Sequence, residues 1–201
     1  MNTKIVLASS SPRRKELLES LGISFEVVSP SSDESLLDNE RPEDYVLRLS
    51  SEKALSVSKN LTGDVLVIGA DTVVVVENEI LGKPKDEEDA RNMLSKISDG
   101  AHHVLTAFSI VKPEHEILHT HVVGTEVMVK TLEPKEIEGY IKTTEPMDKA
   151  GAYGIQGVGA FMIKGIRGSY TNVVGLPLVE VTEALKKLGA LELFSGDGLS
   201  K

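Results

Sequence analysis

Cysteine and tryptophan are absent from this 201-residue chain, and only 4% of its residues are aromatic. The lack of cysteine excludes disulfide bonds and metal sites built on thiolates. No apolar run is long enough to cross a bilayer, so we do not expect a membrane protein. The amino-terminal residues also lack the apolar run and cleavage site of a signal peptide, so we do not expect one there.

Positive charge is also scarce, because 22 Lys and Arg residues stand against 31 Asp and Glu residues, giving a net charge of −9. This balance argues against a nucleic-acid-binding surface, which usually needs a basic face. A small anionic ligand needs only a local cluster of cations. The apolar fraction of 40% can form a sizeable core. We expect one domain over residues 1–193 and a flexible tail over 194–201.

Hydrophobic spacing alternates between helical and extended patterns along the chain. Helical patterns start at Pro12 and stop at Gly22, and recur over residues 43–59, 86–97, 134–143 and the end of 173–188. Extended patterns occupy residues 5–8, 25–28, 65–76 (interrupted at 69–72), 104–111 and 120–130, the last two as an antiparallel pair. This order predicts an α/β fold with a mixed sheet.

Residues 7–18, LASSSPRRKELL, are the most informative segment. An apolar strand ends in three serines, and Pro12 suits the first turn of a helix, where its missing N–H costs nothing. Arg13 and Arg14 follow in that turn. The free N–H groups of a helix start and the two guanidinium groups favour bound phosphate. The alternative is an ordinary Ser-Pro helix start with both arginines in solvent. Two cations at the positive end of a helix dipole favour the anion site.

Asp71 interrupts an otherwise apolar strand pattern, VLVIGADTVVVV over residues 65–76. A buried carboxylate without compensation is too costly to be incidental, so a functional role is favoured. Such a group can bind a hard cation or accept a proton from water. The alternative is an aspartate at a sheet edge that caps a bulge.

Three further charged residues are weaker candidates on local pattern. Glu34 in an acidic loop and Lys53 on the helix over 43–59 read as ordinary solvated charges, although Glu34 becomes a metal ligand if it reaches Asp71. Lys83 lies between Gly82 and Pro84, and the proline restricts its backbone to extended conformations. The local sequence therefore favours Lys83 over Lys53 as a functional cation.

Residues 148–157, DKAGAYGIQG, form a second dense cluster. Small residues let a backbone pass close to a ligand, while Tyr153 and the Gln156 amide suit a nucleobase. The alternative is a tight hairpin with a buried tyrosine. Neither a dinucleotide-binding fingerprint nor a P-loop occurs in the chain. His119 and His121 alternate on one strand face, and two histidines are weak evidence for zinc.

Taken in order, these segments resemble the Maf family of nucleoside triphosphate pyrophosphatases, from about residue 5 to about residue 188. The segments that carry the resemblance are residues 7–18, 33–34 (DE), 49–54 (LSSEKA), 69–72 (GADT), 82–84 (GKP), 148–157 and 169–178 (SYTNVVGLPL). The resemblance implies an elongated mixed sheet flanked by helices, in two lobes with a central cleft, as in the inosine triphosphate pyrophosphatase superfamily. It also implies cleavage between the α and β phosphates with a divalent cation, Mg²⁺ or Mn²⁺. Family members are often cytoplasmic and dimeric.

The resemblance also implies a role for each matching residue. Asp71 activates water and, with Glu34, supports the metal. The phosphate-binding residues by position are Ser9, Arg13, Arg14, Lys53 and Lys83. Such a set fits phosphoryl transfer, which depends on positioning and charge neutralisation.

The same resemblance extends to the nucleobase. Arg13, Thr72 and Gln156 match the subgroup that acts on dTTP and UTP, whereas the 7-methyl-GTP subgroup differs at these positions. A glutamine amide can pair with the O4/N3 edge of thymine or uracil, and modified pyrimidine nucleotides are further candidates. Ser169 departs from the pattern, since an acidic residue is frequent there.

Two other functions fit parts of the sequence. The first is a nucleotide-binding regulator of septum formation and cell division with little turnover, which loss of turnover in Asp71→Asn would separate from an enzyme. The second is an RNA-binding module, which the net charge of −9 and the few aromatic residues disfavour. We therefore expect a nucleotide substrate, no nucleic acid and no membrane partner.

Overall fold

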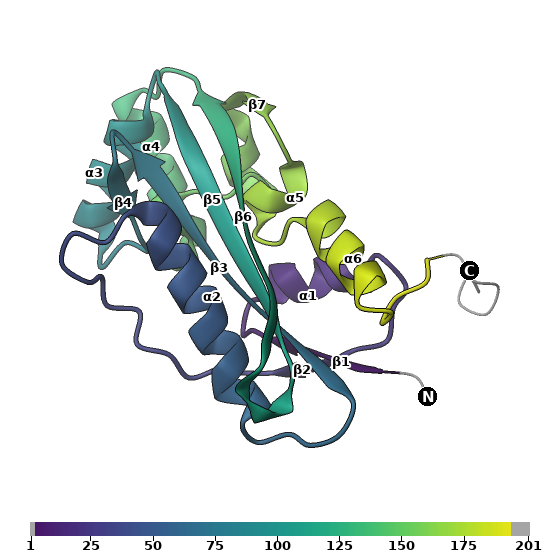
Figure 1. Cartoon of the computed structure of the whole chain (residues 1–201). Helices are drawn as coiled ribbons and strands as arrows, with labels where there is room; N and C mark the ends of the chain where they lie inside the picture. The colour runs from purple at the N-terminus through teal and green to yellow at the C-terminus, as the bar shows by residue number, and fades with distance from the viewer. Residues whose placement is uncertain (1–2, 194–201) are drawn as a thin grey trace. The chain divides into compact units, whose positions relative to one another are not determined.

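The computed structural model describes residues 3–193, and the predicted tail over 194–201 lies outside the described residues (Figure 1). The chain divides into two compact units. Unit 1 contains the described residues up to Asp71, residues 106–122, and those from Gly175 onward, and unit 2 contains residues 72–105 and 123–174. The prediction of one domain over residues 1–193 stays a prediction.

Seven strands form one sheet in the order β2-β1-β3-β5-β6-β7, and β4 pairs with β3. The strands are β1 (Lys4–Ala8), β2 (Glu26–Val28), β3 (Val65–Val76), β4 (Glu79–Leu81), β5 (Ala101–Val111), β6 (Ile117–Val129) and β7 (Ile163–Arg167). In unit 1, β1 is parallel to both β2 and β3. In unit 2, β3 is antiparallel to β4, and β6 to β7. The predicted α/β fold with a mixed sheet is confirmed, and the expected cleft stays a prediction.

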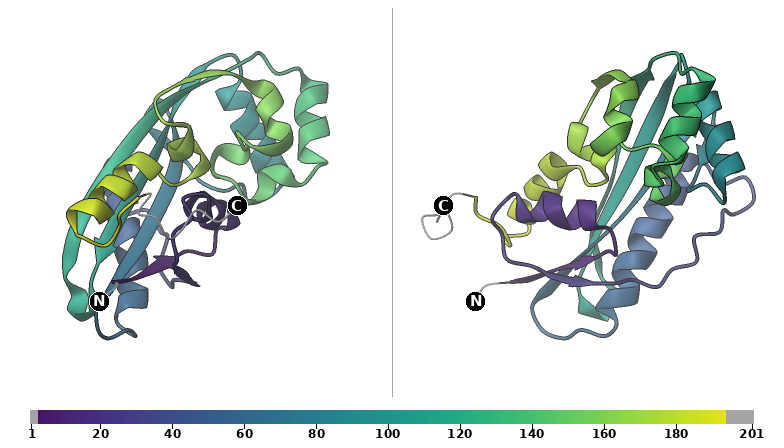
Figure 2. Two further views of the ribbon diagram at one scale, coloured as in Figure 1. Left: turned by 90° about the vertical axis from the view of Figure 1, so that its right-hand side faces the viewer. Right: turned by 180° about the vertical axis from the view of Figure 1, so that it is seen from behind.

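Six α-helices accompany these strands in the described part of the chain (Figures 1 and 2). They are α1 (Pro12–Glu19), α2 (Pro42–Ser58), α3 (Glu87–Ile97), α4 (Pro134–Ile141), α5 (Tyr170–Val174) and α6 (Leu178–Lys187). Short 3₁₀ turns are η1 (Pro113–His115), η2 (Glu145–Asp148), η3 (Ala150–Ala152) and η4 (Gly157–Met162). The closing helix predicted for the end of residues 173–188 is confirmed as α6, and Gly175 and Pro177 separate it from α5.

Unit 1 buries both faces of β1 and of the first part of β3. Ile5 and Leu7 pack on one face with Leu18 of α1 and Leu185 of α6. The alternate residues of β1 and β3 pack on the other face with α2. Figures 1 and 2 show α2 lying along the strands. Strands covered on both faces explain the nearly continuous apolar pattern of β3.

The predicted interruption of β3 at residues 69–72 is wrong, because the strand continues through them and Ala8 of β1 pairs with Gly69. Gly69 has a packing role instead. A Cβ atom there would lie 2.3 Å from the Ser50 carbonyl oxygen and 2.6 Å from the Ala54 backbone nitrogen. The missing side chain therefore lets the backbone of α2 pass directly over β3.

Gly69→Ala should lower the free energy of unfolding by about 3 kcal/mol, because the new methyl group meets helix backbone that cannot move aside. Urea denaturation measures the effect. Gly139→Ala is the matched control, since Gly139 lies in α4 and a Cβ there meets no atom within 4 Å. That control should raise the free energy of unfolding by about 0.5–1 kcal/mol. Equal stability of the two variants would contradict the close packing of α2 on β3.

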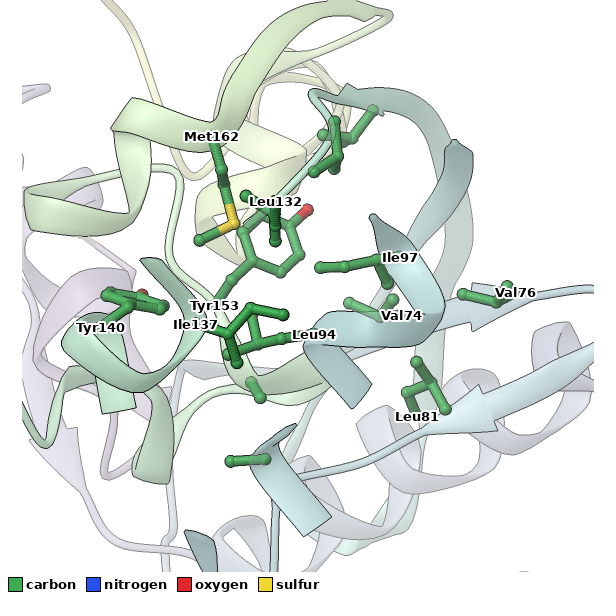
Figure 3. Packing of buried hydrophobic residues seen from close by; sticks show 14 of the residues in the cluster. Val74, Val76, Leu81, Leu94, Ile97, Leu132, Ile137, Tyr140, Tyr153 and Met162 are labelled. Atoms are coloured by element: carbon green, nitrogen blue, oxygen red, sulfur yellow. The ribbon is translucent and has the colours of Figure 1, made fainter. Parts of the chain in front are cut away.

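Unit 2 has its own core, in which residues of β3, β6, α3 and α4 pack around Tyr153 and Met162 (Figure 3). His102 is 1% exposed, and its Nε2 lies 2.7 Å from the hydroxyl oxygen of Tyr153. Burial, together with a smaller effect of the charge of His103, lowers the pKa of His102 to about 4. The buried tyrosine matches the structural alternative for the segment over 148–157.

The low pKa of His102 predicts acid sensitivity. Between pH 6.5 and 4 the unfolded chain binds a proton that the folded chain does not, so the free energy of unfolding falls as the pH falls. The full effect is on the order of 3 kcal/mol. His102→Gln keeps a partner for Tyr153 and cannot titrate, so its loss of stability between pH 7 and pH 4.5 should be smaller than that of the parent chain. Parallel pH curves for the two proteins would refute this.

Candidate active site

Lys53 joins two carboxylates in unit 1. Its Nζ lies 2.6 Å from Oδ1 of Asp71 and 2.6 Å from Oε1 of Glu34. Lys53 and Asp71 are each 7% exposed, whereas Glu34 is exposed. A loop, a helix and a strand thus bring together three residues that the sequence places far apart.

The packing of α2 on β3 explains this arrangement. Residues two apart on a strand share a face, so Asp71 points to the same side as Gly69. That side is covered by α2, because Gly69 touches Ser50 and Ala54. Lys53 precedes Ala54 and therefore reaches Asp71. The register of β3 with β1 ends at Gly69 and that with β4 begins at Val74, so Asp71 lies beyond the end of β1 and the sheet-edge alternative stays open.

The environment of Asp71 makes its carboxylate a stronger base. Burial raises its pKa above the ordinary value, while the charges of Lys53 and Arg14 act in the opposite direction and that of Glu34 raises it. A carboxylate with a raised pKa accepts a proton more readily than an exposed one. Burial also lowers the pKa of Arg14, and the charge of Asp71 opposes this. Asp71 and Arg14 thus share one electrostatic environment.

The segment after β1 forms the predicted helix start, with Pro12 as its first residue. Ser9 is 2% exposed, and its Oγ accepts a hydrogen bond from the Ser11 backbone N–H at 3.1 Å. The Ser11 side chain caps no helix N–H group. Arg14 is half-buried, and its Nε donates to the Gly175 carbonyl oxygen at 2.7 Å. The solvent alternative for Arg14 is therefore wrong, and Arg13 is half-buried as well.

The acidic loop before α2 is tied to that helix by Tyr45 and Arg48, which the sequence analysis missed. The Tyr45 hydroxyl donates to the Glu34 carbonyl oxygen at 2.8 Å. Arg48 donates to the Ser35 carbonyl oxygen at 3.0 Å and to both carboxylate oxygens of Glu40 at 2.7 and 2.8 Å. The spacing of three residues between Tyr45 and Arg48, which puts them on one face of α2, was the available signal.

The two lysine candidates differ in their surroundings. Lys53, which the local pattern treats as solvated, contacts Asp71 and Glu34, whereas Lys83 is exposed in unit 2. Thr72 is half-buried and Gln156 is exposed, both also in unit 2. Convergence of Lys83, Thr72 and Gln156 with the unit 1 residues stays a prediction.

Two other sequence features have local roles. Asn172 donates to the Val104 carbonyl oxygen at 3.0 Å and to Thr125 Oγ1 at 2.9 Å, which fixes α5. The Ser169 hydroxyl, at the position that departs from the family pattern, lies 3.1 Å from Thr171 Oγ1. His119 and His121 do share a strand face, since their rings stack with centroids 6.2 Å apart.

The pair Glu34 and Asp71 has the donor chemistry that a hard divalent cation requires. Both carboxylates already approach a single positive charge, the Lys53 ammonium group. Mg²⁺ and Mn²⁺ favour carboxylate oxygens and complete their coordination with water and phosphate oxygens. Over residues 3–193, no three His, Asp or Glu side chains gather into a larger metal cluster. Within the same residues, no helix has the length and apolarity needed to traverse a bilayer.

Comparisons with known proteins agree along almost the whole chain. A family model described as Maf-like protein matches residues 4–188. A dTTP/UTP pyrophosphatase of Geotalea uraniireducens (strain Rf4) is 53% identical over 94% of this chain and 97% of its own length. One from Clostridioides difficile (strain 630) is 48% identical over 96% and 98%. A solved nucleoside-triphosphatase, a dITP/XTP pyrophosphatase from Mycobacterium abscessus, covers 93% of this chain and 97% of its own with 17% identity and a TM-score of 0.42. The chain belongs to the Maf family.

Proposed function

We propose that this chain hydrolyses nucleoside triphosphates, dTTP and UTP among them, to the monophosphate and pyrophosphate. The observation that carries the proposal is the buried Asp71 carboxylate, held against Lys53 and linked through it to Glu34. Relatives about half identical over nearly their full length are named dTTP/UTP pyrophosphatases, which supports the substrate.

In the proposed reaction one water molecule is added across the bond between the α and β phosphates. Asp71 accepts a proton from that water, since burial raises its pKa and makes it more basic. The remaining hydroxyl group forms a bond to one of the two phosphorus atoms. The bond between that phosphorus and the bridging oxygen breaks, and the bridging oxygen leaves with the other phosphoryl group. Lys53 holds the carboxylate in place through the 2.6 Å contact.

Cationic side chains neutralise the triphosphate in this proposal. Arg14 is held by the Gly175 carbonyl oxygen, and Arg13 and Ser9 belong to the same turn and helix start. Lys53 and Lys83 complete the set. Phosphoryl transfer gains most from such positioned charge, since little covalent assistance is needed. Glu34 and Asp71 would hold a divalent metal, Mg²⁺ or Mn²⁺, which supplies further charge neutralisation at the phosphates.

The finer assignment concerns the base and the setting of the enzyme. Arg13, Thr72 and Gln156 favour thymine and uracil, because a glutamine amide can pair with the O4/N3 edge. Modified pyrimidine triphosphates are included in the proposal. A cytoplasmic location and a homodimer, which the family resemblance implies, belong to it as well.

A panel of canonical and modified triphosphates with Mg²⁺, Mn²⁺ or Co²⁺, scored for monophosphate and pyrophosphate, tests the proposal. We expect equal amounts of the two products, with dTTP and UTP preferred. Orthophosphate as the product, or nucleotide binding without turnover, would overturn the proposed reaction. A preference for purines would overturn only the base assignment.

A further inference from the structure

One carboxylate and one hydroxyl group of unit 2 form hydrogen bonds with the turn that carries Gln156. Oε2 of Glu145 accepts a hydrogen bond from the Val158 backbone N–H at 2.9 Å, and Oε1 accepts one from Gly159 at 2.9 Å. The Tyr140 hydroxyl donates to Oε1 of Glu145 at 2.9 Å. Its oxygen accepts from the Gly154 N–H at 3.2 Å. The two side chains thus bind the backbone of the turn on both sides of Gln156.

Two glycines of this turn allow the close approach of Glu145 and Tyr140. Gly157 has a φ of +73°, and a Cβ atom there would lie 2.6 Å from Oε2 of Glu145. At Gly159 a Cβ would lie 2.5 Å from the Tyr140 hydroxyl oxygen. A larger residue at either position would therefore displace the turn from Glu145 and Tyr140. Lys149 holds the other end of Glu145, since its Nζ donates to the Glu145 carbonyl oxygen at 2.7 Å.

At neutral pH the Glu145 carboxylate is ionised and the Tyr140 hydroxyl group is neutral. Burial raises the pKa of Glu145, but the hydrogen bonds from Gly159, Val158 and Tyr140 outweigh it, and the net pKa lies below the ordinary value. Burial raises the pKa of Tyr140, so its hydroxyl group keeps its proton. An ionised acceptor with a protonated donor beside it gives stronger hydrogen bonds than two neutral groups would.

Gln156 itself is exposed and lies between the residues that Glu145 and Tyr140 bind. An amide distinguishes uracil from cytosine only when its carbonyl and NH₂ groups are fixed in orientation, because rotation by half a turn exchanges donor and acceptor. A mobile backbone would in addition shift the position of this amide relative to a bound base.

We propose that Glu145 and Tyr140 are positioning residues that fix the Gln156 turn and thereby set the preference for uracil over cytosine. This inference rests on the proposed function, in which Gln156 reads the base. Neither residue touches the reacting atoms, so loss of their hydrogen bonds to the turn changes base selectivity more than the proton transfer at Asp71.

Glu145→Gln tests the proposal, because it replaces one acceptor oxygen with an NH₂ group that faces a backbone N–H or the Tyr140 hydroxyl. The quantity measured is the ratio of kcat/KM for UTP to that for CTP. We expect this ratio to fall about tenfold, less than the discrimination that a directly read hydrogen bond gives. Tyr140→Phe should lower it in the same direction, and it serves where Glu145→Gln does not fold. Glu138→Gln is the matched control on α4, the helix that carries Tyr140, since Glu138 pairs with Arg91 and not with the turn.

A double-mutant cycle separates positioning from general stability. Gln156→Ala should lower the UTP/CTP ratio, and adding Glu145→Gln to it should lower the ratio no further. A parent enzyme that releases no pyrophosphate would defeat the proposed function itself, and one with no preference for UTP over CTP would defeat its base assignment. A selective parent whose ratio falls with Gln156→Ala but is unchanged in Glu145→Gln and Tyr140→Phe would overturn only the present inference. Additive losses in the double variant would overturn it too.

Discussion

Asp71→Asn should lower the rate of pyrophosphate release from UTP by about 10²–10⁴-fold, the range that a general base contributes. Asparagine matches aspartate in shape but cannot take a proton from water. The neighbouring charges remain balanced, because Lys53 keeps its 2.6 Å contact with Glu34. The folded structure should therefore survive, and a rate that stays low at saturating Mg²⁺ assigns the loss to the chemical step and not to metal binding. Product formation at saturating UTP measures it.

Asp33→Asn is the control for this variant. Asp33 is an exposed carboxylate next to Glu34, and the hydrogen bonds the structure gives it come from the backbone N–H and hydroxyl of Ser35. Its rate should stay within about twofold of the parent, as expected for a surface change away from the buried groups. If Asp71→Asn keeps more than about a tenth of the parent rate, Asp71 does not accept the proton.

The pH dependence of the parent enzyme provides an independent check on Asp71. A general base must be deprotonated to act, so the rate falls as the pH falls through its pKa. Burial raises that pKa above the ordinary value of 3.8, so the acid limb of the rate profile should lie above pH 3.8.

The fold could be predicted from the sequence where a local rule decided it. Pro12 begins α1 and Pro134 begins α4, as the preference of proline for the first helical turn predicts. The interruption of β3 failed because glycine and aspartate are rare in strands as a class. Here Gly69 serves the packing of α2, and Asp71 is compensated by Lys53, so both are tolerated within a strand.

The candidate site was predictable as a set of residue types but not as a set of contacts. Lys53 looked solvated because its own helix supplies no partner for it, and both of its partners lie on other elements. Local reasoning favoured Lys83 because a following proline is visible in the sequence and a contact with a distant strand is not. Tyr45 and Arg48 were missed for the same reason, since their partners are carbonyl oxygens of the loop, which side-chain patterns do not reveal.

Lys53→Met should lower the free energy of unfolding by about 3–5 kcal/mol, the usual effect of removing one partner from a buried ion pair. Methionine fills a similar volume, so the loss comes from charge and not from a cavity. The Asp71 carboxylate would then remain buried without the ammonium group that now lies 2.6 Å away. Lys15→Met is the matched control, because Lys15 forms an exposed pair with Glu19 one helical turn away. That control should change stability by less than about 0.5 kcal/mol.

The pH dependence of the Lys53→Met deficit identifies its cause. Lys53 lowers the pKa of Asp71, so its removal raises that pKa further in the folded state. A carboxyl group with a raised folded-state pKa binds more protons folded than unfolded, and its destabilising effect grows as the pH rises above the unfolded value of 3.8. The deficit should therefore be larger at pH 7 than at pH 4.5, and much of it should disappear when Lys53→Met is made in the Asp71→Asn background. A deficit independent of pH and of Asp71 would mean that Lys53 stabilises unit 1 by packing alone. The proposed role of Lys53 in holding the Asp71 carboxylate in place would then be wrong.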